Sequence, residues 1–288
     1  MTQNNNNFIM LPKVDFCFKE LMYNPTVRKG FIGALLDVDP ETIRDTTLLP
    51  TILPGDNPDD KTGILDVRVQ LADGTQTDME MQVAYFEHWD KRILFYLCRM
   101  YTEQLKKGNS YENLKKCLHV SILDFNHFPD DRTCYRTISL RDNRTFEPYS
   151  DLLEIKILEL KKLPKKSGTE QDTVLDWMRF FSGKTREEMA AVASKNKYIG
   201  EAYNTLVELS SDEKKRLEYE AREKALRDYN SQISSAYQRG EKDGLEIGEK
   251  RGLEQAKMVF RLHMQGKTNE EIAAIRQIPI EKVNEILE

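Results

Sequence analysis

Two carboxylates, Asp66 and Glu80, lie in a segment whose pattern predicts a β-hairpin over residues 64–83. Apolar and polar residues alternate along both arms, which is typical of half-buried strands. The link at 72–74 ends in glycine and suits a three-residue hairpin loop with a left-handed last residue. That loop places Asp66 opposite Glu80. Because like charges directly opposite each other destabilise a sheet, a divalent cation between them is the simplest remedy.

This prediction depends on the register of the hairpin. With Leu71 paired to Thr75, the odd-numbered residues form an apolar face and the even-numbered residues a polar one. A two-residue turn would shift the register by one and separate the two acids, but it would also expose half of the apolar residues of one arm. The alternative for the polar face is simple contact with water. That face carries Asp66, Arg68, Gln70, Asp78, Glu80 and Gln82.

Asp66, followed after a strand-length gap by Glu80-Met81-Gln82, resembles the core motif of the PD-(D/E)XK nucleases, with Gln82 in the place usually held by lysine. The wider sequence resembles one branch, the recombination-promoting nuclease/putative transposase family. The resemblance covers roughly residues 8–165. It is carried by several motifs in the right order, at 11–19, 63–68, 80–83, 91–92, Tyr96, Tyr101, 104–108 and 120–125.

The resemblance implies a Mg²⁺-dependent DNA endonuclease that hydrolyses phosphodiester bonds, with Mn²⁺ able to substitute. Asp66 and Glu80 would then be both catalytic residues and metal ligands, since Mg²⁺ prefers carboxylate oxygen and keeps several waters. Gln82 can hydrogen-bond but cannot take up a proton, so we assign it to orienting water or phosphate. The general base stays open, and Leu65 stands where the motif usually has proline.

Three further site residues follow from the resemblance. Asp15, in a short helix predicted over 14–21, is the third candidate metal ligand; the alternative is an acid that favours the helix dipole. Arg92 and Gln104, on a helix predicted over 87–107, are expected to bind substrate; the alternative is a solvated helix face. The histidines show no pair at metal-ligand spacing, so a zinc site is not expected.

Composition indicates an intracellular protein of cytoplasmic, prokaryotic type. Of 288 residues, 39% are hydrophobic and 32% charged, and the net charge of −5 argues against a broad electrostatic grip on DNA. The four cysteines are not clustered, which favours free thiols in a reducing compartment. There is no apolar run long enough for a membrane span, and neither a membrane nor a nucleotide cofactor is expected.

The expected fold class is α/β: a restriction-endonuclease-like mixed sheet flanked by helices, followed by an all-helical C-terminal extension. Two or three helices are expected over 8–50 and a loop over 50–61. Further strands are expected over 118–125, 134–140 and 152–160, and a linker over 164–168. We expect a nuclease-like core at 1–165, a packed helical segment at 166–210, a long charged helix at 211–265 and a small helical module at 266–288.

The long charged helix carries small or apolar residues spaced by four, ending in Gly240, Gly244, Gly248 and Gly252. Four interior glycines cost a helix about 4 kcal/mol relative to alanine. Close approach of a second helix would offset that cost, so we expect a homo-oligomer formed through this helix. The alternative is a frayed, charged linker.

The last module resembles a helix-turn-helix in outline, with a capping box predicted at Thr268–Glu271 and a final helix opened by Pro279. Its last helix is acidic and therefore poorly suited to the major groove. Two functions remain open at this point. The first is the endonuclease, with DNA as its partner; the second is an oligomeric interaction protein with a nuclease-like fold and little or no turnover.

Overall fold

The computed structural model describes residues 8–55, 57, 59, 61–164 and 172–288. Contacts divide the chain into two compact units, Met1–Lys224 and Ala225–Glu288. The linker predicted at 164–168 lies almost wholly outside the described residues, as does the boundary predicted at 165.

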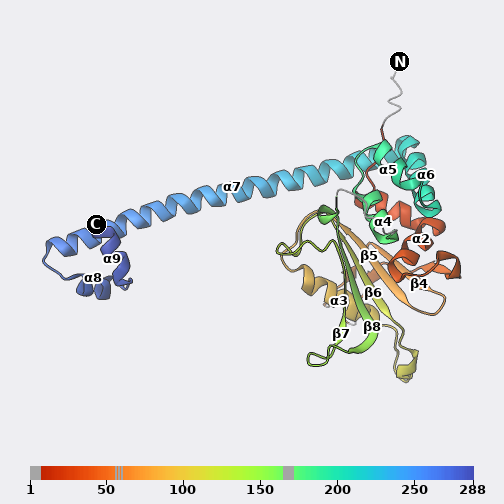
Figure 1. Cartoon of the computed structure of the whole chain (residues 1–288), viewed down its shortest axis with the longest axis horizontal. Coiled ribbons are helices and arrows are strands. Elements are labelled where there is room, and N and C mark those ends of the chain that lie inside the picture. Colours follow the sequence, from red (N-terminus) through yellow and green to blue (C-terminus); the bar gives the residue numbers. More distant parts are fainter. Residues whose placement is uncertain (1–7, 56, 58, 60, 165–171) are drawn as a thin grey trace, which may run out of the picture. The chain divides into compact units, whose positions relative to one another are not determined.

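The first unit is built on a six-stranded mixed sheet with the order β1-β4-β5-β6-β8-β7 (Figure 1). The three central strands β5, β6 and β8 run parallel, whereas β1, β4 and β7 pair antiparallel with their neighbours. The carboxyl ends of the parallel strands therefore meet at one edge of the sheet. The strands are β1 (Thr46–Leu48), β4 (Val67–Leu71), β5 (Gln76–Gln82), β6 (Cys117–Leu123), β7 (Tyr135–Arg141) and β8 (Pro148–Glu159).

The hairpin of β4 and β5 has the register that the sequence predicts. Arg68 pairs with Asp78, and the Leu71 N–H donates to the Thr75 carbonyl oxygen at 2.8 Å. Gly74 closes the three-residue loop with a φ of +90°, a conformation that favours glycine. The even-numbered face, however, is not simply solvated: Asp78 is fully buried and Glu80 is 2% exposed, although Asp66 is partly exposed. The simple solvated-surface alternative is therefore wrong.

Helices cover both faces of the sheet, as the sequence predicts. The odd-numbered face packs under α1 (Asp15–Tyr23), α2 (Pro25–Leu36), α4 (Thr173–Ser182), α5 (Arg186–Ala193) and α6 (Lys197–Ser211). The even-numbered face packs under α3 (Trp89–Thr102), on the opposite side of the sheet in Figure 1. The core on the α3 side is split into two small clusters.

Local sequence explains where α1 ends and α2 begins. The Asn24 side chain accepts hydrogen bonds from the N–H groups of Thr26 and Val27, and Pro25 occupies the first position of α2. Asparagine is a strong N-cap, and proline is pre-organised for the first helical turn. This break turns the chain back, so that α1 and α2 both lie on the apolar face of the sheet.

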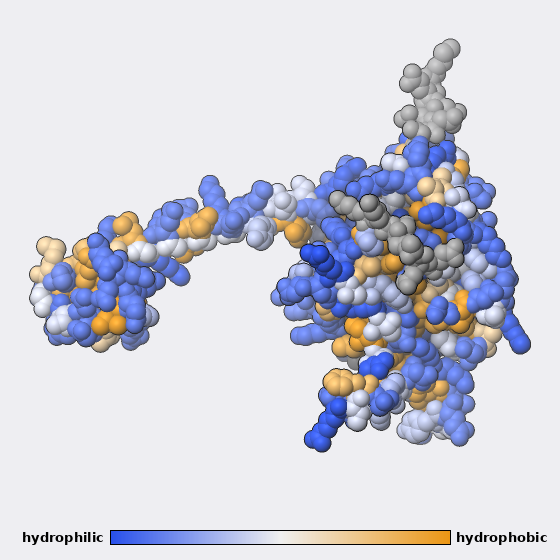
Figure 2. All heavy atoms as spheres, in the orientation of Figure 1, coloured by the Kyte–Doolittle hydropathy of each residue, from blue (hydrophilic) through white to orange (hydrophobic). Residues whose placement is uncertain are grey.

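The second unit contains most of α7 (Glu213–Met264), from Ala225 onward, with α8 (Asn269–Arg276) and α9 (Ile280–Leu287). The predicted capping box is present, because Thr268 and Glu271 bond reciprocally. Val259, Ile272 and Val283 form a small core. Along α7 the hydrophobic side chains form separate spots among hydrophilic ones (Figure 2).

Several short elements differ from the predicted ones. The loop expected over 50–61 contains β2 (Ile52–Leu53), which pairs with β3 (Gly63–Ile64), and β1 lies in the region where only helices are expected. The helix expected over 87–107 ends at Thr102. None of the described helices is long and apolar enough to cross a membrane.

Candidate functional site

Asp66 lies directly before β4, next to the strand end that carries Glu80. Its Oδ2 accepts a hydrogen bond from the Met81 N–H at 3.3 Å, which fixes the carboxylate beside the end of β5. Its side chain is 18% exposed, so it lies at the rim of the site. The paired residues of β4 and β5 end at Val67 and Met79, which are the direct neighbours of Asp66 and Glu80 in the sequence. Asp66 thus lies at the same end of the hairpin as Glu80, as the register predicts.

Glu80 is an almost fully buried carboxyl group with one cationic partner. Arg92 of α3 donates from Nη2 to its Oε2 at 3.1 Å, and the guanidinium lies 4.4 Å from the centre of the Trp89 ring. Burial, reinforced by Asp78, raises the pKa of Glu80 to about 7, although His119 and Arg92 oppose the rise. Glu80 therefore exchanges its proton near neutrality, unlike a surface glutamate.

Lys19 of α1 links Asp66 to Asp15. Its Nζ lies 3.0 Å from Asp66 Oδ1 and 2.9 Å from Asp15 Oδ1. Burial alone would lower the pKa of Lys19, but Asp66 and Asp15 outweigh it and raise that pKa. Burial also raises the pKa of Asp66, helped by Asp15 and opposed by Lys19. Asp15 is thus linked to Asp66 through an ammonium group and not by a direct contact. It also lies 3.3 Å from Arg222.

A buried polar chain lies behind Glu80 and was not predicted from the sequence. Asp78 Oδ2 is 2.7 Å from His119 Nδ1, and His119 Nε2 is 2.8 Å from Ser121 Oγ; all three side chains are fully buried. Burial raises the pKa of Asp78 and lowers that of His119 to about 4. The parallel pairing of β5 and β6 places Asp78 beside His119 and Glu80 beside Ser121. These three side chains are closed to solvent, so they do not reach a bound substrate directly.

The remaining predicted site residues lie at opposite ends of the strands. Gln82 ends β5, two residues after Glu80 and on the same face. Gln104 bonds both backbone groups of Lys115, at 3.1 Å and 2.8 Å, near the start of β6. Four residues of strand, about 13 Å, separate that level from Glu80. The structure therefore joins Arg92 to the acids and leaves Gln104 apart.

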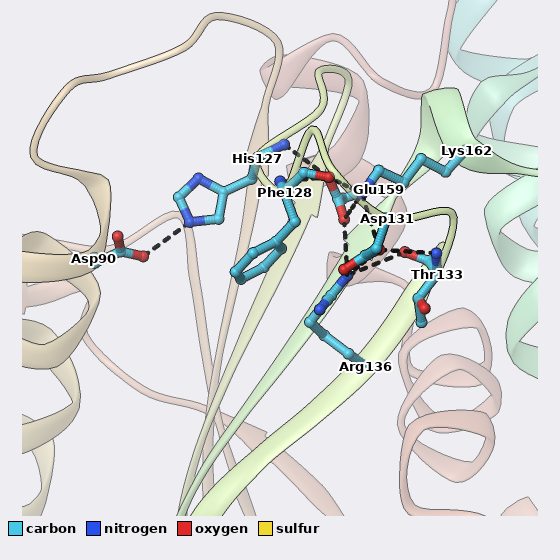
Figure 3. A network of polar contacts seen from close by, with 8 residues as sticks. All are labelled: Asp90, His127, Phe128, Asp131, Thr133, Arg136, Glu159 and Lys162. Atoms are coloured by element: carbon cyan, nitrogen blue, oxygen red, sulfur yellow. Dashed lines mark hydrogen bonds and ion pairs between the residues drawn. The ribbon is translucent and has the colours of Figure 1, made fainter.

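Gln82 also belongs to a row of residues across the carboxyl edge of the parallel strands, where it pairs with Leu123 and Leu123 with Glu159. Glu159 is fully buried and accepts the N–H groups of His127 and Phe128 at 2.7 Å and 3.1 Å. Lys162 contacts the same carboxylate at 2.9 Å (Figure 3). This network fixes the connection between β6 and β7 against the edge that carries Gln82.

The residues present suit a divalent cation with few protein ligands. In the described part of the chain, no group of three or more His, Cys, Asp or Glu side chains could hold a metal ion. Mg²⁺, however, usually takes only one or two carboxylates and keeps its waters. Asp66 and Glu80 supply two carboxylates, and Asp78 has a buried Oδ1 without a hydrogen-bond partner among the described residues. In the structure, the positive charges of Lys19 and Arg92 lie beside Asp66 and Glu80, where a bound cation would supply positive charge.

A comparison with protein-family models agrees with this geometry. Residues 12–236, most of the chain, match the model described as PD-(D/E)XK nuclease family transposase. No curated protein and no solved structure matches the chain. The matched range includes both acids, the Glu80-Met81-Gln82 motif and the whole mixed sheet. The chain therefore belongs to the PD-(D/E)XK nuclease family transposases.

Proposed function

We propose that the protein is a Mg²⁺-dependent DNA endonuclease related to the recombination-promoting nucleases. One observation carries the proposal: Asp66 accepts the backbone N–H of Met81, the residue next to the buried Glu80, at the carboxyl end of β5. Burying a carboxyl group beside other acids costs free energy that an apolar residue would not. A site that must hold a cation accounts for that cost.

Each residue has a proposed role. Asp66 and Glu80 hold the metal ion, which would polarise the scissile phosphate and lower the pKa of a bound water. Gln82 orients water or phosphate, and Arg92 binds a phosphate oxygen when it leaves Glu80. Asp15 would become a third metal ligand only if the Lys19 ammonium group moved out from between Asp15 and Asp66. A contact from Gln104 would reach DNA remote from the scissile bond, because Gln104 lies near the start of β6.

The test is cleavage of supercoiled plasmid in Mg²⁺ or Mn²⁺, with EDTA and Asp66→Asn as negative controls. Asp151→Asn is the matched control, because Asp151 is an exposed aspartate of β8 outside the site. We expect nicking or linearisation by the wild type and by Asp151→Asn only. Cleavage that survives Asp66→Asn would contradict the assigned site. An absence of cleavage with any metal would favour the oligomeric interaction protein.

We further propose that α7 mediates homo-oligomerisation. A Cβ added at Gly240, Gly244, Gly248 or Gly252 would meet nothing within 4 Å among the described residues, so packing within the described chain does not require these glycines. Light scattering after size exclusion compares the wild type with Gly244→Ala/Gly248→Ala. Dissociation in the variant supports a close helix–helix approach. An unchanged mass would contradict it.

A further inference from the structure

Two exposed aromatic rings follow the candidate site directly. Tyr85 and Phe86 lie three and four residues after Gln82 and are 60% and 47% exposed. Single exposed hydrophobic residues are common on proteins. Their position is the informative feature, because they begin the connection from β5, which carries Glu80, to α3, which carries Arg92.

Each ring packs against a neighbouring side chain. Tyr85 packs edge to face on Phe125, with ring centres 5.7 Å apart. Phe125 is half-buried against the cluster of α3 and the ends of β6 and β8. Phe86 lies 5.4 Å from the Arg92 guanidinium, which in turn bonds Glu80. Phe86 is thus coupled to the site through Arg92, and Tyr85 is held against the connection that follows β6.

The connection that carries Phe125 is itself held in place. The Asp124 N–H donates to the Gln82 carbonyl oxygen at 2.8 Å, and the Asp124 carboxylate binds Lys13 at 2.7 Å. His127 of the same connection lies 2.9 Å from Asp90 of α3 (Figure 3). A ligand that contacts Tyr85 would therefore meet a surface that is already ordered, which lowers the entropic cost of binding.

We propose that Tyr85 and Phe86 form a stacking platform for an unpaired base of the DNA strand whose phosphate would lie at a metal ion held by Asp66 and Glu80. This inference rests on the proposed function and specifies its substrate as single-stranded or locally unpaired DNA. Aromatic rings bind bases through their faces whatever the sequence, and bases stacked inside a duplex do not offer those faces. The net charge of −5 limits phosphate attraction, so stacking carries a larger share of binding.

The test is a binding measurement that needs no turnover. Fluorescence anisotropy measures the affinity of the full chain for a labelled 12-nucleotide single strand and for the corresponding duplex, in Ca²⁺, with gels to check that the DNA stays intact. The variants are Tyr85→Ala and Phe86→Ala, and Tyr85→Phe retains the ring. Tyr111→Ala is the matched control, since Tyr111 is 83% exposed and lies in the 3₁₀ turn Tyr111–Asn113 before β6.

We expect the wild type to bind the single strand at least about tenfold more tightly than the duplex, and each alanine variant of the platform to lose about tenfold on the single strand only. Tyr85→Phe and Tyr111→Ala should bind like the wild type. Thermal melts confirm that each variant is folded. Three results would overturn the platform. The wild type could bind both DNAs with equal affinity, the alanine variants could lose equal affinity for both DNAs, or neither alanine variant could lose affinity.

The two proposals fail separately. If the protein binds single strands through these rings but never cleaves DNA, the platform proposal stands and the nuclease proposal fails. If the protein is a metal-dependent nuclease but Tyr85→Ala and Phe86→Ala leave its affinity for single strands unchanged, the nuclease proposal stands and the platform proposal fails.

Discussion

The two faces of the central sheet are made from alternate residues of the same strands, yet they differ in chemistry. In β5, Met79 and Met81 enter the apolar core under α1, α2, α4 and α6, whereas Asp78 and Glu80 are buried under α3. The first face gains stability from apolar burial. The second buries titratable groups that cost stability unless they are paired. We propose that the α3 face serves binding and chemistry, while the other face stabilises the fold.

The largest expected effect is on the apolar face. Phe181 is fully buried, and the centre of its ring lies 5.7, 5.1 and 5.7 Å from the ring centres of Phe18, Phe31 and Trp177. Phe181→Ala should lower the free energy of unfolding by about 3–5 kcal/mol, because it removes apolar contacts and leaves a cavity. Urea denaturation measures the loss. A loss below about 1 kcal/mol would contradict the stabilising role of this face.

The next effect is a pH dependence on the α3 face. The pKa of Glu80 is about 7 in the folded protein against an ordinary 4.5, so only the unfolded chain ionises this group between those values. Its contribution to stability is therefore complete below pH 4.5 and is lost as the pH rises through 7, by about 3 kcal/mol in all. Glu80→Gln should reduce that fall in urea titrations with EDTA. An identical pH profile in the variant would show that Glu80 titrates normally.

A smaller loss is expected from the chain of buried polar groups behind Glu80. Ser121→Ala removes the hydrogen-bond partner of His119 Nε2 and should cost about 1–3 kcal/mol, since a buried polar atom is left unpaired. Ser194→Ala, which removes an exposed hydroxyl, is the control and should change stability by less than about 0.5 kcal/mol. Equal losses of stability in the two variants would show that the Ser121 hydroxyl does not stabilise the buried Asp78–His119–Ser121 group.

The smallest effect has the opposite sign. Thr77 is fully buried, and its Oγ1 has no hydrogen-bond partner among the described residues. Thr77→Val replaces the hydroxyl with a methyl group of similar size and should raise the free energy of unfolding by about 1 kcal/mol. Thermal or urea unfolding tests this. A destabilised variant would mean that this hydroxyl does contribute to the fold.

The hairpin could be predicted from the sequence because local rules determine its register. The alternating pattern and Gly74 allow only one loop that keeps the apolar residues on one face, and Asp66 and Glu80 follow from it. The helix boundary at Asn24-Pro25 and the capping box at Thr268 are equally local. These features depend on neighbours within a few residues.

The rest of the site depends on pairings between distant residues. Asp78 and His119 are 41 positions apart, and the parallel register that joins them leaves no local signal in either strand. The link from Lys19 to Asp66 requires α1 to pack beside the start of β4. Strands β1 and β2 are three and two residues long, too short for an alternating pattern. Such features are fixed by tertiary packing.

The central claim is that Asp66 and Glu80 bind a divalent cation. Isothermal titration calorimetry with Mn²⁺ at pH 8, where Glu80 is ionised, tests it directly on the wild type, Asp66→Asn, Glu80→Gln and Asp151→Asn. We predict a binding event in the wild type and in Asp151→Asn that weakens about a hundredfold or more in the two site variants. Equal Mn²⁺ affinity in all four proteins, or no binding to the wild type, would contradict the account.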